Sequence, residues 1–438
     1  MNAFNNVSHL IKKLVISLGF KYSSSKVFQG TLFIFISNII SKAIGFLLIM
    51  LIAKHLGVDE YGKLTVILAL MTTVADFVSS GLNSSLVRYS AKYISENKYE
   101  KLTPLLSTAF VNILLIGVML ALVIYFTSDS LSQFLLDSSQ YNHYIEITSF
   151  GIIFTLVSGI YSSLFLGIQN YLKYFYYSVF SQLIRIILFF VIINIFEDSL
   201  MAIVILFVIT PLLAFLFGYY LEKNIKLNIL AYDINILKEI FSFGKWVFLW
   251  GVVAIIQSRM DIYLLAHLSN TEEVAFFDMA QKFVLIVMMA FGAYGAALNP
   301  KMAGLSKSFE IQSAVKNTYK VIFVMTLFLV TMYFLIPLII NYIFSNKYDS
   351  SILPFQIMII SSFFHMLAMP FNASVYAIGK SQVFFYSSLI ALVINLVSSL
   401  YFIPLYGSIG ASISYIFVNV SSLLTAYMFY KYYIKRIN

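Results

Sequence analysis

Seven charged side chains lie inside long apolar stretches of this sequence, where charge is rare. They are Lys42, Asp76, Arg185, Arg259, Asp261, Asp278 and Lys282. A charge near the centre of a membrane-spanning helix costs about 2.5 to 3.5 kcal/mol on insertion scales, so it is retained facing the bundle interior or a wet cavity. We therefore take these seven residues as the candidate functional side chains.

The four cations in this set suit the binding of an anion. A guanidinium stays charged and grips a carboxylate or a pyrophosphate through two hydrogen bonds. Arg185 and Arg259 have no obvious partner in their own segments, and Asp261 lies only two residues from Arg259 and points to a different side. The two arginines are the strongest candidates for substrate binding, and Lys42 and Lys282 are further candidates.

The three carboxylates are natural sites for a proton or a cation that couples to the function. They are Asp76, Asp261 and Asp278. A structural interpretation stands beside this one. Asp278 and Lys282 are spaced i,i+4 and can neutralise each other on one helix face. Lys42 and Asp76 lie near mid-span on adjacent predicted helices and can form a buried pair.

The elements that must position these residues are predicted to be membrane helices. The chain has 438 residues, of which 61% are hydrophobic and 11% charged, whereas soluble domains are about 45–50% apolar. A crossing of the hydrocarbon core needs about 20 apolar residues. Twelve segments qualify: 30–53, 64–86, 104–127, 146–168, 173–196, 199–221, 244–268, 273–297, 319–344, 351–377, 382–404 and 407–430. They predict an all-α membrane protein with twelve transmembrane helices.

The distribution of positive charge predicts the orientation of these helices. Of the 28 Lys and Arg residues, four lie inside the apolar segments away from their ends, and three lie in connections on one side (Lys54, Lys63 and Lys347). The other 21 lie in connections or at segment ends on the side of the termini. Cytoplasmic connections carry the excess of positive charge. We therefore expect a multi-pass protein of the cytoplasmic (inner) membrane with both termini in the cytoplasm and only short external connections.

The chain also reads as two related halves. The segment IAKHLGVDE (52–60) closes the first predicted helix and LLAHLSNTE (264–272) closes the seventh, at an offset of 212 residues. Such repeats are common in secondary transporters. We expect an N-terminal lobe over 1–221 that begins with an interfacial helix at 9–20, a cytoplasmic link over 222–243, and a C-terminal lobe over 244–438. The two six-helix lobes would enclose a central cavity.

The sequence lacks the residues that disulfides, nucleotide binding and metal binding require. The absence of cysteine excludes disulfides, thiolate nucleophiles and cysteine-based metal sites. Gly379-Lys380-Ser381 is similar to the end of a phosphate-binding loop, but Ser374 stands where its first glycine belongs. No HExxH motif or close pair of histidines indicates a metal. Because the basic residues are scattered between apolar runs, nucleic acid is not an expected partner. We expect no cofactor and no enzymatic activity.

Three stretches resemble a known family. LIAKHLGVDEYGKLTVILAL (51–70) and GLNSSLVRYSAKY (81–93) resemble the first lobe, and SRMDIYLLAHLSNTEEVAFFDMAQKF (258–283) the start of the second lobe, of the polysaccharide flippase branch of the multidrug/oligosaccharidyl-lipid/polysaccharide exporter superfamily. The second-lobe motif of that family usually has glycine, tyrosine and a small polar residue where this chain has Ala275, Phe277 and Asp278.

The resemblance implies a fold like that of MATE transporters and a flippase function. The substrate would be an undecaprenyl-pyrophosphate-linked oligosaccharide, such as an O-antigen or capsule repeat unit, carried across the membrane by alternating access. Implied partners are this lipid, membrane lipid, polysaccharide-assembly proteins and a coupling ion, H⁺ or Na⁺. A cation-coupled multidrug exporter of the same superfamily is the alternative. A glycan polymerase or glycosyltransferase is disfavoured, because no external connection is long enough to carry an active site.

Overall fold

The computed structural model of the chain describes residues 26–303, 305, 308–378 and 382–434, and all its long elements are α-helices. Twelve of these helices have 22 residues or more. They are α2 (Lys26–Leu56), α3 (Val58–Ser95), α4 (Leu102–Phe126), α6 (Asn142–Gly167), α7 (Tyr171–Ile192), α8 (Ser199–Leu221), α9 (Ile234–Leu268), α10 (Thr271–Ala303), α11 (Ser308–Phe344), α12 (Ile352–Ala377), α13 (Gln382–Tyr406) and α14 (Ser408–Ile434). The shorter elements are α5 (Ser128–Leu136) and the 3-10 turns Tyr99–Lys101, Ser139–Tyr141, Ile229–Ala231 and Asp349–Ser351. The interfacial helix predicted at 9–20 lies outside the described residues.

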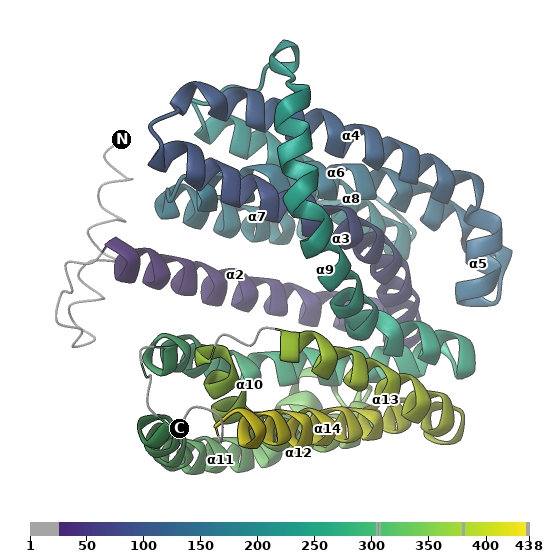
Figure 1. Cartoon of the computed structure of the whole chain (residues 1–438). Coiled ribbons are helices and arrows are strands. Elements are labelled where there is room, and N and C mark those ends of the chain that lie inside the picture. Colours follow the sequence, from purple (N-terminus) through teal and green to yellow (C-terminus); the bar gives the residue numbers. More distant parts are fainter. Residues whose placement is uncertain (1–25, 304, 306–307, 379–381, 435–438) are drawn as a thin grey trace.

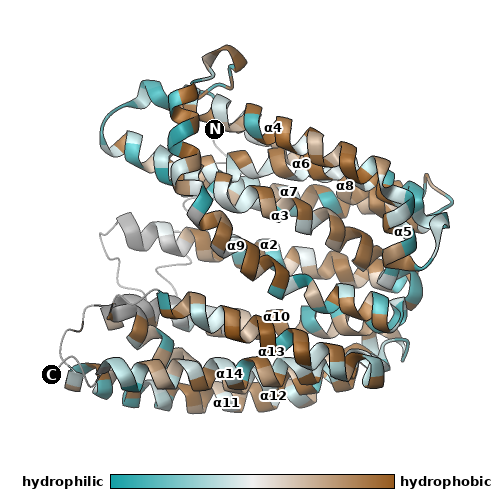
Figure 2. Cartoon of the chain, turned by 45° about the vertical axis from the view of Figure 1, so that its right-hand side comes forward, coloured by the Kyte–Doolittle hydropathy of each residue, from teal (hydrophilic) through white to brown (hydrophobic). Residues whose placement is uncertain are grey.

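Most of these helices are long and apolar enough to cross a membrane. Ten ranges of the described chain meet this criterion, and one of them, Gln382–Tyr433, contains both α13 and α14. The long helix outside these ranges is α10, which carries Asp278 and Lys282. Hydrophobic residues cover the helix bodies and hydrophilic residues gather toward their ends (Figure 2). The predicted class, a multi-pass all-α membrane protein, is confirmed.

The helices form two groups that lie one above the other (Figure 1). We call α2 to α8 the N-lobe and α10 to α14 the C-lobe. Helix α9 runs from one group to the other. Near its start, the Ser85 hydroxyl of α3 donates a hydrogen bond to the carbonyl of Ile240 over 3.0 Å. Near its other end, Asp261 accepts a hydrogen bond from Ser399 of α13 over 3.0 Å. One continuous helix therefore connects the two lobes.

The lobes also meet at the end of the bundle where α2 turns into α3 and α9 into α10, which we call the closed end. Gly57 makes the first turn at a φ of +84°, a conformation that glycine adopts without strain. A Cβ on Gly62 would lie 1.8 Å from the carbonyl oxygen of Thr271, so α3 and α10 touch through backbone. Thr271 also donates a hydrogen bond of 2.6 Å to Asp59, 212 residues earlier. Residues separated by the 212-residue offset thus contact each other at the closed end.

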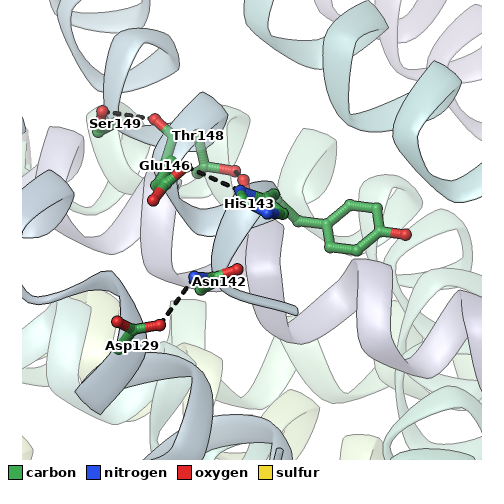
Figure 3. A network of polar contacts seen from close by, with 7 residues as sticks. Asp129, Asn142, His143, Glu146, Thr148 and Ser149 are labelled. Atoms are coloured by element: carbon green, nitrogen blue, oxygen red, sulfur yellow. Dashed lines mark hydrogen bonds and ion pairs between the residues drawn. The ribbon is translucent and has the colours of Figure 1, made fainter. Parts of the chain in front are cut away.

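The connection between α5 and α6 lies beside the closed end. The ring of Phe134 in α5 stacks on that of His267 at the end of α9, with centroids 5.2 Å apart. Asn142, the first residue of α6, donates a hydrogen bond of 2.7 Å to Asp129 of α5 (Figure 3). Polar contacts on the protein surface therefore hold this connection in place next to the contact between the lobes.

Candidate functional site

A cavity of about 330 Å³ lies between the two lobes. Helices α2, α7 and α8 form one side of it and α10 forms the other. Its lining residues are Ser41, Lys42, Gly45, Phe46, Ile49, Gln182, Arg185, Phe207, Lys282, Leu285, Ile286 and Met289. Three of the four predicted substrate-binding cations, Lys42, Arg185 and Lys282, therefore line one cavity, although they come from three different helices. We call this cavity the pocket.

Arg185 is held in the pocket wall by an aromatic contact. Its guanidinium carbon lies 4.8 Å from the centre of the Phe207 ring of α8, which is a cation–π geometry. Its buried Nε has no hydrogen-bond partner in the described part of the chain. Because an unsatisfied buried polar group costs about 1–3 kcal/mol, such a donor needs a reason to be retained.

Two neutral side chains of the pocket share this feature. Gln182 lies three residues before Arg185 and therefore on the same face of α7. The buried Oε1 of Gln182 and the buried Oγ of Ser41 have no hydrogen-bond partner among the described residues. The residues that line the pocket thus carry one buried donor and two buried acceptor oxygens without partners, together with three cations. A ligand that carries both anionic oxygens and hydroxyl groups would satisfy this set.

The position of Lys282 places the pocket well inside the bundle. It lies eleven residues after the first residue of α10, which corresponds to about 16 Å along the helix axis at about 1.5 Å per residue. Much of the remaining wall is apolar, including Phe46, Ile286 and Met289. Charges interact more strongly beside such walls than in bulk water, so the pocket suits a small charged group.

Lys282 also takes part in a contact between the lobes. Its Nζ lies 3.1 Å from Oδ1 of Asp278, one turn earlier on α10. The Tyr61 hydroxyl of α3 donates a hydrogen bond of 2.5 Å to the other oxygen of Asp278. Tyr61 and Asp278 are only 1% and 3% exposed. The i,i+4 pair predicted from the sequence is formed, and it extends to the N-lobe through a residue that the sequence did not single out.

Arg259 and Asp76 lie away from the pocket and near each other. Asp76 on α3 is exposed, and no ion pair within 4 Å joins it to Arg259 on α9 among the described residues. Nearby on the same two helices, the Tyr263 hydroxyl donates to Thr73 over 2.9 Å. The predicted buried pair of Lys42 and Asp76 is therefore wrong: both residues are exposed, no ion pair joins them among the described residues, and Lys42 lines the pocket.

Asp261 lies inside the C-lobe in a polar cluster of its own. Its two oxygens accept hydrogen bonds from the Ser399 hydroxyl over 3.0 Å and from the Asn395 amide over 3.4 Å. It is 2% exposed. We call Asp261, Asn395 and Ser399 the C-lobe cluster. The seven predicted charges are thus divided among the pocket, its link to the closed end, the contact of α3 with α9, and this cluster.

Sequence reasoning missed Ser41, Gln182 and Tyr61. Serine, glutamine and tyrosine are common in membrane helices, so hydropathy and charge gave no signal for them. The spacing of Gln182 three residues from Arg185 is the one sequence feature that could have suggested a role.

Comparison with known proteins gives two matches by sequence. The profile of a family described as "polysaccharide biosynthesis protein" matches residues 27–306. A protein of Shigella flexneri, provisionally described as an O-antigen transporter, is 24% identical over 216 residues. This match covers 48% of the present chain, which in turn spans about half (51%) of that relative.

Solved structures match nearly the whole chain. A multidrug resistance MATE family transporter of the MOP superfamily, in an inward-facing conformation, has a TM-score of 0.75 and 15% identity, covering 92% of this chain and 95% of its own. The lipid II flippase MurJ, in an inward closed conformation, has a TM-score of 0.74 and 18% identity, covering 92% and 87%. The predicted MATE-like fold is confirmed. These similar proteins are described as transporters or flippases.

Proposed function

The chain belongs to the polysaccharide biosynthesis protein family, and we propose that it is a flippase for a lipid-linked oligosaccharide. In this proposal the substrate is an undecaprenyl-pyrophosphate-linked O-antigen or capsule repeat unit. The provisional role of the Shigella relative and the fold shared with the lipid II flippase support this assignment.

The observation that carries the proposal is the pocket. Lys42, Arg185 and Lys282 surround a space in which Arg185 Nε and Gln182 Oε1 lack partners. A pyrophosphate would accept hydrogen bonds from the cations, and a hydroxyl of the adjoining sugar would donate to the amide oxygen. The volume of about 330 Å³ is near the lower end of the range for ligand pockets, about 300–1,000 Å³. It therefore suits the charged head, with the remaining sugars and the lipid tail outside.

In our proposal the two lobes work by alternating access. With both termini in the cytoplasm of the inner membrane, as the charge distribution predicts, the closed end faces outward and the pocket is reached from inside. The inward-facing and inward closed states of the two similar structures support this orientation. Rocking of the lobes would open the closed end and release the head group on the other side.

The carboxylates supply candidates for ion coupling. In our proposal Asp261 takes up H⁺ or Na⁺ in the C-lobe cluster, where a hydroxyl and an amide lie within 3.4 Å. Asp76 on α3 and Asp278 beside the pocket are the further candidates. The same cluster would serve a cation-coupled drug exporter, which is the second candidate function because of the MATE fold.

The direct test is lipid binding to the full chain in nanodiscs, followed by native mass spectrometry. We expect undecaprenyl pyrophosphate to bind at least about tenfold more tightly than undecaprenol, with undecaprenyl phosphate between them. Arg185→Ala should weaken pyrophosphate binding by about tenfold, since one charge-assisted hydrogen bond contributes about 1.5–3 kcal/mol. Lys226→Ala, in the exposed link before α9, is the matched control. Equal affinity for the charged and neutral lipids would refute the proposal.

Deletion in the native host separates the two candidate functions. Loss of surface polysaccharide with unchanged drug tolerance supports the flippase, and the reverse result supports the exporter. Arg185→Ala and Arg259→Ala are then introduced singly at normal protein levels. Normal surface polysaccharide in both would remove the arginines from the mechanism.

A further inference from the structure

Asp278 stands between the pocket and the closed end. One of its oxygens faces Lys282, which lines the pocket, at 3.1 Å. The other accepts the hydrogen bond from Tyr61, which belongs to the opposite lobe, at 2.5 Å. No other contact among the described residues joins a group of the pocket to the opposite lobe through one carboxylate in this way. Asp278 therefore links a residue of the pocket to the contact that closes the end.

The neighbouring groups cannot replace Lys282 as the counter-charge of Asp278. Tyr348 packs against Tyr61, with ring centroids 6.2 Å apart, but its hydroxyl donates to the carbonyls of Ala53 and Gly57, 3.3 Å from each. Tyr61 donates a hydrogen bond but carries no charge. Lys282 is therefore the cation that compensates this buried carboxylate while the end is closed.

An anion in the pocket competes for that cation. Lys282 shares the pocket with Lys42 and Arg185, so an anionic group bound there attracts all three. As Lys282 turns toward the anion, Asp278 loses its counter-charge while it remains 3% exposed. A buried carboxylate without a partner strongly destabilises the state that buries it. The closed arrangement then becomes the unfavourable one.

We propose that Tyr61 and Asp278 form a latch that keeps the closed end shut while the pocket is empty, and that an anion on Lys282 releases it. This inference rests on the proposed function, because it takes the anionic head of the substrate as the releasing group. Tyr61 and Asp278 are positioning residues, since they act through Lys282. The latch makes opening dependent on cargo, so that the empty protein does not open outward.

Two conservative substitutions separate the two parts of the latch. Tyr61→Phe removes the hydrogen bond to the opposite lobe and keeps the ring that packs near Tyr348, with centroids 6.2 Å apart in the native protein. Asp278→Asn keeps an oxygen that accepts the Tyr61 hydroxyl but removes the charge that needs Lys282. The first variant should weaken closure, and the second should make closure insensitive to the ligand.

The experiment measures the width of the closed end in the full chain in nanodiscs. Because the chain has no cysteine, spin labels can be placed through Glu60→Cys and Glu272→Cys, two exposed positions at the tips of the α2–α3 and α9–α10 turns. Pulsed electron resonance then reports the distance distribution with and without undecaprenyl pyrophosphate. The matched control is Tyr177→Phe, which removes a hydrogen bond of 2.5 Å inside the N-lobe.

In the native background we expect the lipid to increase the long-distance population at least about threefold. Tyr61→Phe should show that population without lipid, with lipid affinity within about threefold of native. Asp278→Asn should bind lipid but show no shift, and Tyr177→Phe should behave as native. Thermal unfolding confirms that each variant is folded.

Two results would overturn the latch: an unchanged distance in lipid-free Tyr61→Phe, or a native lipid response in Asp278→Asn. The distance measurement on lipid-free Tyr61→Phe needs no ligand, so it tests the latch even if the lipid does not bind. Absence of lipid binding to the native chain refutes the proposed function instead, and the two failures are therefore distinguishable.

Discussion

The pocket and the C-lobe cluster both place charge inside the helical bundle, yet their polar groups are satisfied to different degrees. In the pocket, Arg185 Nε and Gln182 Oε1 are buried without partners. In the cluster, both oxygens of Asp261 accept hydrogen bonds, from Ser399 and Asn395. Since burial without a partner is costly, the unpartnered groups of the pocket are ones that a ligand would satisfy, whereas each oxygen of Asp261 already has a partner on α13.

This difference indicates how an intramembrane charge should be interpreted. The presence of a charge in an apolar helix does not by itself distinguish a ligand site from a structural contact. The hydrogen bonds of the neighbouring polar groups add evidence, because a buried group without a partner in the protein is free to bind a ligand. Substitutions in the pocket should therefore change lipid affinity with little loss of stability, and substitutions in the cluster should do the reverse or change ion coupling.

The largest effect is expected from reversing a charge in the pocket. Arg185→Glu removes the charge-assisted hydrogen bonds and adds repulsion, so we expect about 100-fold weaker binding of undecaprenyl pyrophosphate. Binding in nanodiscs measures it, and Lys226→Glu, with the same charge change in an exposed link, is the control. Native affinity in Arg185→Glu would contradict the proposed difference between the two regions, because the pocket would then not be the anion site.

A smaller effect, on transport alone, is expected from neutralising the cluster. Asp261→Asn keeps a side chain of the same shape that can bond to Ser399, so lipid affinity should stay within about twofold. Surface polysaccharide at equal protein level should fall about tenfold, if the carboxylate takes up the coupling ion. An equal fall in lipid affinity would show that the cluster and the pocket are not separate sites.

The neutral amide of the pocket should have an intermediate effect on binding. Gln182→Leu removes the orphan acceptor at similar volume, and a net hydrogen bond contributes about 0.5–1.5 kcal/mol. We expect about five- to tenfold weaker binding of a pyrophosphate lipid that carries a sugar and no change for undecaprenyl pyrophosphate. Gln133→Leu, on exposed α5, is the control. A similar loss for both lipids would mean that Gln182 does not contact the sugar.

The smallest expected effect is a change in stability. It tests the difference between the two regions directly, because the same serine-to-alanine substitution is made in both. Ser399→Ala removes a donor that Asp261 uses and should lower stability by about 1 kcal/mol, seen as a lower unfolding midpoint. Ser41→Ala removes a hydroxyl without a partner among the described residues and should leave the midpoint unchanged or raise it. Equal losses in the two variants would contradict the distinction.

The number and class of the helices were predictable, but their ends were not. The predicted segment 64–86 corresponds to α3, which extends over Val58–Ser95. The break predicted near 405–406 is found between α13 and α14, at Gly407 with a φ of +54°. Hydropathy detects the apolar part of a helix, whereas the end turns of α3 mix charged residues with buried ones such as Tyr61 and Tyr93, whose burial depends on tertiary packing.

The two predicted charge pairs also differ in whether local helix geometry or tertiary packing decides them. The Asp278–Lys282 pair was correct, because i,i+4 spacing on a helix brings side chains together whatever the rest of the chain does. The Lys42–Asp76 pair was wrong, because it depended on how α2 and α3 rotate toward each other and toward α9. That rotation is set by packing, including the approach of Gly62 to Thr271.

By itself, the sequence determined that this is a multi-pass helical membrane protein with seven intramembrane charges, because the cost of placing polar groups in lipid acts on each segment separately. Only the tertiary structure decided that Lys42, Arg185 and Lys282 share one pocket and that Asp278 reaches Tyr61. These contacts join residues as much as 240 positions apart, from Lys42 to Lys282. No local rule of helix geometry or hydropathy relates such distant residues, and only the packing of the lobes brings them together.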